Sequence, residues 1–260
     1  LIMNKQGSPV SSLSLTLPCA DRSLETYRLA ASRIFPAKLE GTLNRVAFSA
    51  AHVVADPLAD SDPWLTAAID WDRTIAFREY VWGLGLGVAE AMDTAQRGMG
   101  LDWPTSLELI QRSVNAAKAN GNALVFSGAG TDHLAPENAK SLDDVIRAYE
   151  EQIAAVEKAG GRIILMASRA LAKLGRSADD YAKVYNRVLS QVREPVIIHW
   201  LGDMFDPALA NYWGTPSLDT AMDTAVGIIN ANAAKVDGVK VSLLDKQREI
   251  RAQIDHVKTE

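Results

Sequence analysis

The chain has 260 residues, of which 48% are hydrophobic and 23% are charged, and its formal net charge is -5. This composition excludes a disordered tail, a collagen-like fibre and a disulfide scaffold. The single cysteine, Cys19, fits a reduced, cytoplasmic setting. No apolar run reaches the roughly 18 residues of a membrane helix, and the polar start lacks the pattern of a signal peptide. Because no basic surface is indicated, we expect neither a membrane nor a nucleic acid as partner.

In chain order, residues 1–40 predict an N-terminal arm with a short hairpin, whose strands are expected at 13–17 and 26–29. Residues 41–260 predict one barrel domain. Short runs rich in branched residues predict six buried parallel strands in it: Arg45–Ser49, Leu86–Met92, Ala123–Ser127, Arg162–Ala167, Pro195–Trp200 and Gly238–Leu243. Amphipathic stretches predict the helices Asp70–Leu84, Pro104–Asn120, Ser141–Ala159, Ser177–Val192, Ser217–Lys235 and Asp245–Val257.

This repeated βα unit indicates an α/β fold, a parallel sheet with helices packed outside it. Two architectures fit the repeat, an open doubly wound sheet and a TIM-type (β/α) barrel. A complete barrel has eight strands and typically about 250 residues. Six units occupy the whole chain, so as a barrel it would lack the last two.

Three histidines fall at or just beyond predicted strand ends, namely His52, His133 and His199. The carboxyl ends of parallel strands meet at one face, where ligands bind. Imidazole is a good ligand for Zn²⁺, so one interpretation is a metal site made of these three side chains. The other interpretation is that each is a hydrogen-bonded polar residue, since no short metal-binding spacing is present.

Further polar residues follow the second and third strands. Glu90, Asp93 and Arg97 come at the end of the second strand, where a buried acid is costly unless it is paired. Arg97 therefore either forms a structural ion pair with one of these acids or leaves them free to bind substrate hydroxyls. After the third strand, Ser127, Gly128 and Asp132 belong to a turn of small residues, which is either a plain βα turn or a place where a ligand can approach the backbone.

Lys240 stands inside an apolar strand. A lysine in such a strand is rare unless it is paired or has a chemical task. Burial would lower its pKa, and a neutral amine attacks carbonyl groups to form a Schiff base. The alternative is a lysine at a strand edge whose ammonium extends to water.

The stretches Pro195-Val-Ile-Ile-His199-Trp-Leu-Gly and Val236-Asp-Gly-Val-Lys240 resemble the dihydrodipicolinate synthase and N-acetylneuraminate lyase superfamily. The resemblance implies a (β/α)₈ barrel that forms a Schiff base between an oxo acid and a lysine on the sixth strand. It places that lysine at Lys240 and puts His199 where the superfamily has a proton-shuttling tyrosine.

Roughly residues 13 to 250 look like a bacterial family of unknown function within this superfamily. The motifs are Ala50-Ala-His52-Val-Val-Ala-Asp56-Pro57 and the stretch from Ala89 to Trp103. The superfamily holds the oxo-acid carboxylate with a Gly-Thr-Thr-Gly-Glu turn, of which only Thr94 is present here. Arg97 offers a replacement contact for an anion.

We therefore expect a Schiff-base lyase of the aldolase type, acting on an oxo acid or a sugar-derived carbonyl compound, without a cofactor. In it, Lys240 is the nucleophile and His199 moves protons. The expected substrate-binding residues are Asp93, Glu90, Thr94, Arg97, Ser127, Gly128, Asp132 and His52. The alternatives are the metal enzyme and a non-catalytic truncated barrel. Because such a barrel exposes strand edges, we expect a homo-oligomer.

Overall fold

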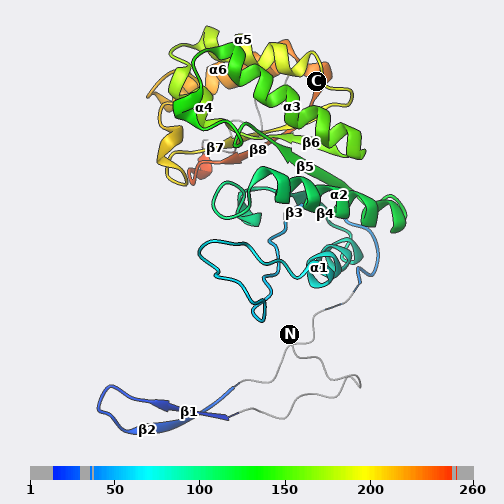
Figure 1. The fold of residues 1–260 in the computed structure, drawn as a ribbon, viewed down its shortest axis with the longest axis vertical. Helices are drawn as coiled ribbons and strands as arrows, with labels where there is room; N and C mark the ends of the chain where they lie inside the picture. Colours follow the sequence, from blue (N-terminus) through cyan, green and yellow to red (C-terminus); the bar gives the residue numbers. More distant parts are fainter. Residues whose placement is uncertain (1–13, 30–35, 37, 248–249, 251–260) are drawn as a thin grey trace.

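A computed structural model describes residues 14–29, 36, 38–247 and 250. Its centre is a six-stranded parallel sheet in the order β3-β4-β5-β6-β7-β8, so neighbours in sequence are neighbours in space (Figure 1). The strands are β3 (Phe48–Ala50), β4 (Gly87–Glu90), β5 (Val125–Ala129), β6 (Arg162–Leu165), β7 (Val196–Leu201) and β8 (Val236–Ser242). A separate antiparallel hairpin pairs β1 (Ser14–Pro18) with β2 (Leu24–Arg28).

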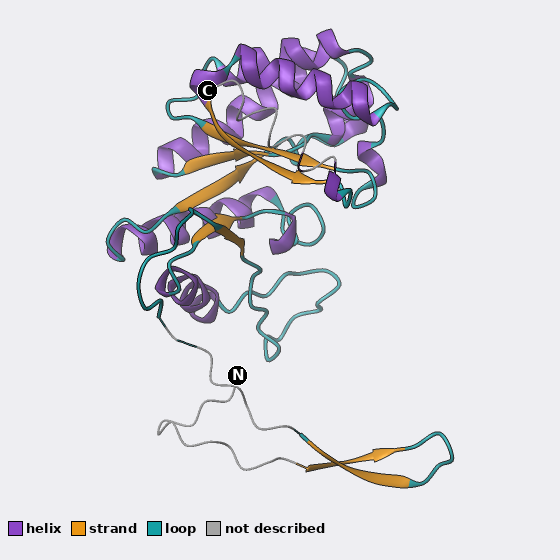
Figure 2. Cartoon of the chain, turned by 180° about the vertical axis from the view of Figure 1, so that it is seen from behind, coloured by secondary structure: helices purple, strands orange, loops and turns teal. Residues whose placement is uncertain are grey.

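Helices connect successive strands of the parallel sheet (Figure 2). They are α1 (Trp71–Gly83), α2 (Trp103–Ala119), α3 (Leu142–Ala159), α4 (Arg169–Leu174), α5 (Ala178–Leu189) and α6 (Leu218–Ala231). Short 3₁₀ turns lie in the connections: η1 (Asp93–Ala95), η2 (Pro136–Asn138), η3 (Pro207–Leu209) and η4 (Ala233–Lys235). Within the described residues, no helix is both long enough and apolar enough to cross a membrane.

Local sequence explains where the longer helices begin. Ser141 and Ser177 each accept a hydrogen bond from the backbone three residues later, and Asp144 and Asp180 bond back to complete the capping boxes. At the start of α2, the side chain of Asp102 caps the backbone of Thr105 and a proline occupies the first turn. These caps satisfy backbone donors that the helix itself leaves unpaired.

The sheet is wound in one direction and curls into a half-barrel. Its outward side chains join the large core together with residues of the helices, whereas the inward side chains form a second, smaller cluster. That inner cluster contains Ala89, Met92, Phe126, Ile164 and Met166, and within the described residues no helix contributes to it. One covered face is the arrangement of a barrel, so the doubly wound alternative is wrong.

All six predicted strands of the sheet and the N-terminal hairpin are confirmed, with boundaries that differ by up to a few residues. Five of the predicted helices are also confirmed. α4 was not predicted, because a helix of six residues offers too short a stretch for an amphipathic pattern. The sixth predicted helix, Asp245–Val257, lies largely outside the described residues.

A completely buried ion pair joins the first two units of the half-barrel. Two nitrogens of Arg78 on α1 each donate to a carboxylate oxygen of Glu90 on β4 at 2.8 Å, and both side chains are fully buried. Glu90 also accepts from the hydroxyl of Ser113 on α2. Arg78 donates further to the carbonyl of His52 at 2.6 Å. The pair thus fixes α1, α2 and the end of β3 around β4.

We expect Arg78→Met to lower the free energy of unfolding by about 3–5 kcal/mol, because it leaves the Glu90 carboxylate buried without its cation. Urea denaturation followed by circular dichroism measures this. The double variant Arg78→Met/Glu90→Met should regain most of the loss, since it removes both charges. Equal destabilisation of the single and double variants would show that the charge pair is not the source of the effect.

Candidate active site at the carboxyl ends of the strands

Lys240 and His199 form a hydrogen-bonded pair on the inner face of the half-barrel. The two residues are direct neighbours in the register of β7 and β8, and Nζ of Lys240 lies 2.9 Å from Nε2 of His199. Ile198 and Trp200 beside His199 point into the helix-covered core, as do Val239 and Val241 beside Lys240. Because side chains alternate along a strand, the lysine and the histidine both face inward.

Burial suppresses charge on this pair. Burial and the nearby charge of Lys240 lower the pKa of His199 from 6.5 to about 3, so its imidazole is neutral near neutral pH. Burial also lowers the pKa of Lys240, although the carboxylate of Asp93 opposes that shift. When Lys240 is an ammonium, Nε2 of His199 must accept the hydrogen bond, and the ring proton then resides on Nδ1.

Asp93 faces the other side of the imidazole. Its Oδ2 lies 3.7 Å from Nδ1 of His199, too long for a hydrogen bond, and Nδ1 is buried with no other partner among the described residues. Burial raises the pKa of Asp93, while the positive charges of Lys240, Arg97 and Arg169 act against this. Lys240, His199 and Asp93 therefore form a line of three titratable groups from three different strands or strand ends.

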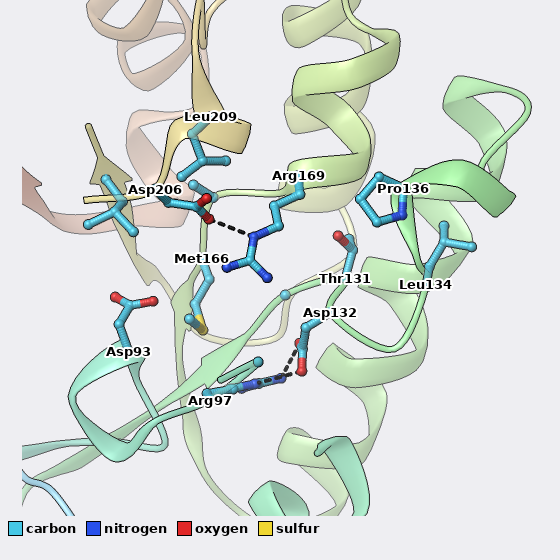
Figure 3. A pocket seen from close by; sticks show the side chains of 14 residues that line it. Asp93, Arg97, Thr131, Asp132, Leu134, Pro136, Met166, Arg169, Asp206 and Leu209 are labelled. Carbon is cyan, nitrogen blue, oxygen red and sulfur yellow. Dashed lines mark hydrogen bonds and ion pairs between the residues drawn. The ribbon is translucent and has the colours of Figure 1, made fainter. Parts of the chain in front are cut away.

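A small cavity of about 80 Å³ opens next to Asp93 at the carboxyl ends of the strands (Figure 3). Its polar lining residues are Asp93, Arg97, Thr131, Asp132, Arg169 and Asp206. Leu201 also lines it, and this residue comes shortly after His199 on β7. His199 and Lys240 are not in the lining, so Asp93 is the member of the three that connects them with the cavity.

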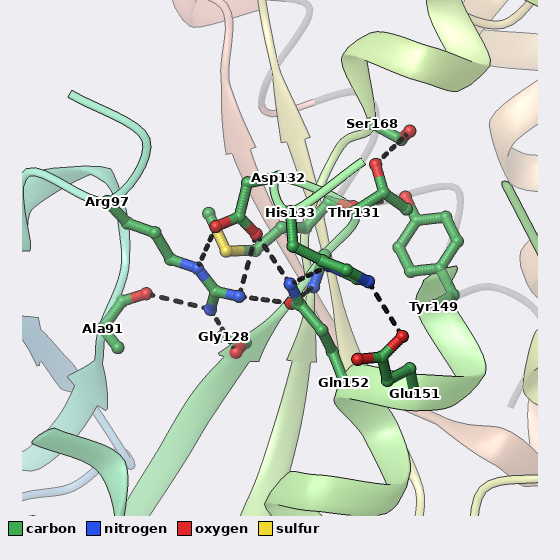
Figure 4. A network of polar contacts seen from close by, with 12 residues as sticks. Ala91, Arg97, Gly128, Thr131, Asp132, His133, Tyr149, Glu151, Gln152 and Ser168 are labelled. Carbon is green, nitrogen blue, oxygen red and sulfur yellow. Dashed lines mark hydrogen bonds and ion pairs between the residues drawn. The ribbon is translucent and has the colours of Figure 1, made fainter. Parts of the chain in front are cut away.

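Arg97 is held by the protein through every one of its donors. Its guanidinium donates to both carboxylate oxygens of Asp132, to the carbonyls of Ala91 and Gly128 and to the side-chain oxygen of Gln152 (Figure 4). A guanidinium has five N–H groups, and these five bonds use them all. Arg97 therefore has a structural ion pair with Asp132, and the predicted anion contact from Arg97 is not available in this arrangement.

The same network explains the small residues after β5. A Cβ atom on Gly128 would come within 2.8 Å of the Ala91 carbonyl and 3.0 Å of Nη1 of Arg97. The space that glycine leaves is thus used by the arginine and not by a ligand. Asp132 sits at the cavity, where burial would raise its pKa but the charge and hydrogen bonds of Arg97 lower it.

Of the eight expected substrate-binding residues, Asp93, Arg97 and Asp132 line the cavity and five do not: Glu90, Thr94, Ser127, Gly128 and His52. Glu90 faces the helices and is saturated by Arg78, so its assignment to substrate is corrected to a structural one. Ser127 lies between the outward residues Val125 and Ala129 and is completely buried. Thr94 is exposed on η1 and does not line the cavity.

The structure does not bring the three histidines together. His52 is exposed and stacks on Phe77, with 5.0 Å between the ring centroids, which does not support its expected contact with substrate. His133 contacts Gln152 and Glu151 instead (Figure 4). In the part of the chain that the structure describes, no three His, Cys, Asp or Glu side chains are grouped as metal ligands require. The metal site proposed from these histidines is therefore wrong.

Two functional candidates were not found from the sequence, Arg169 and Asp206. Nε of Arg169, the first residue of α4, donates to Oδ2 of Asp206 at 2.6 Å across the cavity wall. Behind them, buried tyrosines hold the loop after β6: Tyr149 donates to the carbonyl of Met166 at 2.6 Å, and Tyr212 accepts from the backbone of Ser168 at 3.1 Å. The two members of the Arg169 pair are 37 positions apart in the sequence, so no local motif connects them.

Comparison with known protein families identifies the chain. The model of a family described as "Protein of unknown function (DUF993)" matches residues 15–257, nearly the full length. The chain belongs to this family. No curated protein matches the sequence.

Among solved structures, the DUF993 chain is similar to members of the dihydrodipicolinate synthase family. The TM-score is 0.53 for the Bacillus clausii synthase, at 15% identity over 80% of this chain and 57% of that one. For the Agrobacterium tumefaciens synthase, the TM-score is 0.53 at 19% identity, over 82% of this chain and 63% of that one. For the 4-hydroxy-tetrahydrodipicolinate synthase of Methylacidiphilum fumariolicum, the TM-score is 0.55 at 12% identity, over 84% of this chain and 59% of that one. The chain thus shares their fold and spans about three fifths of their length.

The buried imidazole predicts an acid-sensitive fold. A group whose pKa is lower in the folded state than in the unfolded state binds its proton on unfolding, so His199 should cost stability as the pH falls from 6.5 towards 3. We expect His199→Gln to lose less stability over this range than the wild type, by urea denaturation at a series of pH values. The exposed His52 supplies a matched control, since His52→Gln should keep the wild-type pH dependence. Parallel curves for the wild type and His199→Gln would contradict the assignment.

Proposed function

We propose that this DUF993 protein is a lyase of the aldolase type that forms an imine between Lys240 and a carbonyl substrate. The observation that carries the proposal is the inward-facing Lys240, whose Nζ lies 2.9 Å from the neutral imidazole of His199 and whose pKa is lowered by burial. A neutral amine is the form that attacks a carbonyl carbon. The shared fold with dihydrodipicolinate synthase structures supports this chemistry by analogy.

The line of three titratable groups supplies a route for the proton that the ammonium must lose. Nε2 of His199 accepts a proton from Lys240 while Nδ1 releases its own proton to Asp93. The result is a neutral amine, a neutral imidazole with its proton on Nε2, and a protonated carboxyl group. Burial disfavours both the ammonium and the carboxylate, which reduces the cost of this transfer. The 3.7 Å gap between His199 and Asp93 must close during the step, as catalytic hydrogen bonds commonly do when substrate binds.

The amine nitrogen of Lys240 then bonds to the carbonyl carbon, and the carbonyl oxygen takes up a proton to give a carbinolamine. Loss of water, with a proton delivered from Asp93 or His199, leaves an iminium ion. Cleavage of the adjacent carbon–carbon bond sends its electron pair into the iminium and forms an enamine. The hydroxyl proton of the departing fragment goes to the carboxylate of Asp93, which lies at the cavity and can act as a base. Protonation of the enamine and hydrolysis of the imine restore Lys240.

Nδ1 of His199 has no hydrogen-bond partner among the described residues, and Asp93 is placed to supply one. A phenol in the corresponding position would need no such partner, whereas an imidazole has two ring nitrogens to satisfy. Among the described residues, Asp93 is the carboxylate that faces Nδ1. We therefore assign Asp93 a catalytic role in proton transfer in addition to its expected contact with substrate hydroxyls.

Borohydride trapping tests the imine directly. We expect incubation with a panel of oxo acids and sugar-derived ketones, followed by reduction, to give a mass adduct that peptide mapping places on Lys240. Lys240→Met should give no adduct with any compound. Lys235 provides a matched control on the preceding turn, because its ammonium donates to the carbonyl of Val192 at 2.8 Å. Lys235→Ala should trap like the wild type, and a Lys240→Met protein that keeps full activity would rule out the mechanism.

The pH profile of trapping tests the role of Asp93. The carboxylate raises the pKa of Lys240 against the effect of burial, so Asp93→Asn should lower that pKa further. The rate of imine formation should then reach its plateau at a lower pH than in the wild type, while turnover falls by roughly a hundredfold or more because the proton acceptor is lost. Rates measured by quenching with borohydride across pH 5 to 10 give the profile. A profile that does not move would show that Asp93 and Lys240 are not electrostatically coupled.

A further inference from the structure

Arg169 is directed into the cavity with most of its donors unused. Its Nε donates to Asp206, and none of the described residues accepts from its two terminal nitrogens. The side chain is 40% exposed, in contrast to that of Arg97, which is 1% exposed. Figure 3 shows the guanidinium of Arg169 pointing between Asp93 and Asp132. Two terminal nitrogens of a guanidinium match the spacing of two oxygens on a carboxylate or phosphate.

The other arginine that lines the cavity, Arg97, has no donor left to bind an added anion. All five N–H groups of Arg97 are bonded within the protein, and its charge is balanced by Asp132. Of the two arginines that line the cavity, Arg169 is therefore the one that can bind an added anion without breaking protein contacts.

We propose that Arg169 binds an oxyanion of the substrate, a carboxylate or phosphate group placed away from the carbonyl that reacts with Lys240. This inference rests on the proposed function and deepens it. Asp93 faces His199, which is bonded to Lys240, and it lines the same cavity as Arg169, so it connects the two ends of the site. A substrate would place its carbonyl at Lys240, a hydroxyl at Asp93 and its oxyanion at Arg169.

This arrangement defines a class of substrate. It favours an open-chain hydroxylated carbonyl compound with an acidic group at the far end, and it disfavours neutral sugars and ketones of the same length. It differs from binding of a carboxylate directly beside the carbonyl, because Arg169 extends from the loop after β6 whereas Lys240 lies on β8. Asp206 positions the guanidinium by accepting from Nε, which leaves the terminal nitrogens facing the cavity.

The test uses matched probes that differ in the anionic group. Dihydroxyacetone phosphate is compared with dihydroxyacetone, and 4-oxopentanoate is compared with 4-oxopentanamide. Binding is measured by calorimetry on the Lys240→Ala protein, which cannot form the imine, so the result does not depend on the proposed reaction. The two pairs separate phosphate from carboxylate as the preferred oxyanion.

We expect at least one anionic probe to bind about tenfold or more tightly than its neutral partner. Arg169→Met in the same background should abolish that preference, and Arg169→Lys should restore only part of it because lysine lacks the two-nitrogen fork. Asp206→Asn should keep the preference or strengthen it, since the amide oxygen can still accept from Nε while the competing negative charge is gone.

The proposal is overturned if neither anionic probe binds better than its neutral partner, or if the preference persists in Arg169→Met. If Arg169 serves only to join α4 to η3, then Arg169→Met and Asp206→Asn should both lower the melting temperature and neither should change the preference. Failure of the proposed function gives a different result. In that case the anion preference depends on Arg169, yet borohydride traps no adduct on Lys240 of the wild type.

Discussion

The candidate site depends on one constraint, the alternation of side chains along strands whose sheet is covered by helices on one face only. Inward positions carry Phe126, Ile164 and the pair formed by His199 and Lys240, while outward positions pack against helices. An ionisable group on the outward face must be neutralised inside the helix layer, as Glu90 is by Arg78. The ionisable groups on the inward face, His199 and Lys240, are connected with the cavity through Asp93. The candidate catalytic pair of His199 and Lys240 therefore lies on the inward face of the sheet, and the structural ion pair of Glu90 and Arg78 lies on the outward face.

The buried guanidinium of Arg97 gives the cavity its shape. It ties the turn after β4 to the end of β5 and, through Gln152, to α3. A buried cation of this kind is stable only when its donors are satisfied, and here the protein satisfies all of them. The two arginines at the cavity therefore differ in their contacts. Arg97 joins the segments that form the cavity wall, whereas the terminal nitrogens of Arg169 have no acceptor among the described residues.

The sheet and its helices could be predicted from the sequence, because a buried parallel strand and a capped amphipathic helix leave local patterns. The resemblance of two strands to the dihydrodipicolinate synthase superfamily pointed to Lys240 and His199, which lie 41 positions apart in the sequence. Glu90 and Ser127 were assigned wrongly because their position near a strand end was considered without the direction of the side chain. The alternation from Val88 to Glu90 already carried that information. The pair of Arg169 and Asp206 had no local signal, since its members are 37 positions apart, at the start of α4 and just before η3.

Burial has a different consequence for each member of the line from Lys240 to Asp93. It lowers the pKa of Lys240 and of His199 and raises the pKa of Asp93, so each group is moved towards its neutral form. The mutual attraction of the ammonium and the carboxylate opposes two of these shifts, those of Lys240 and Asp93. An iminium ion at Lys240 would keep the positive charge that Asp93 attracts, while the ammonium proton would be gone. In the proposed mechanism, the carboxylate of Asp93 would therefore stabilise the iminium ion in the same way that it favours the ammonium form of Lys240.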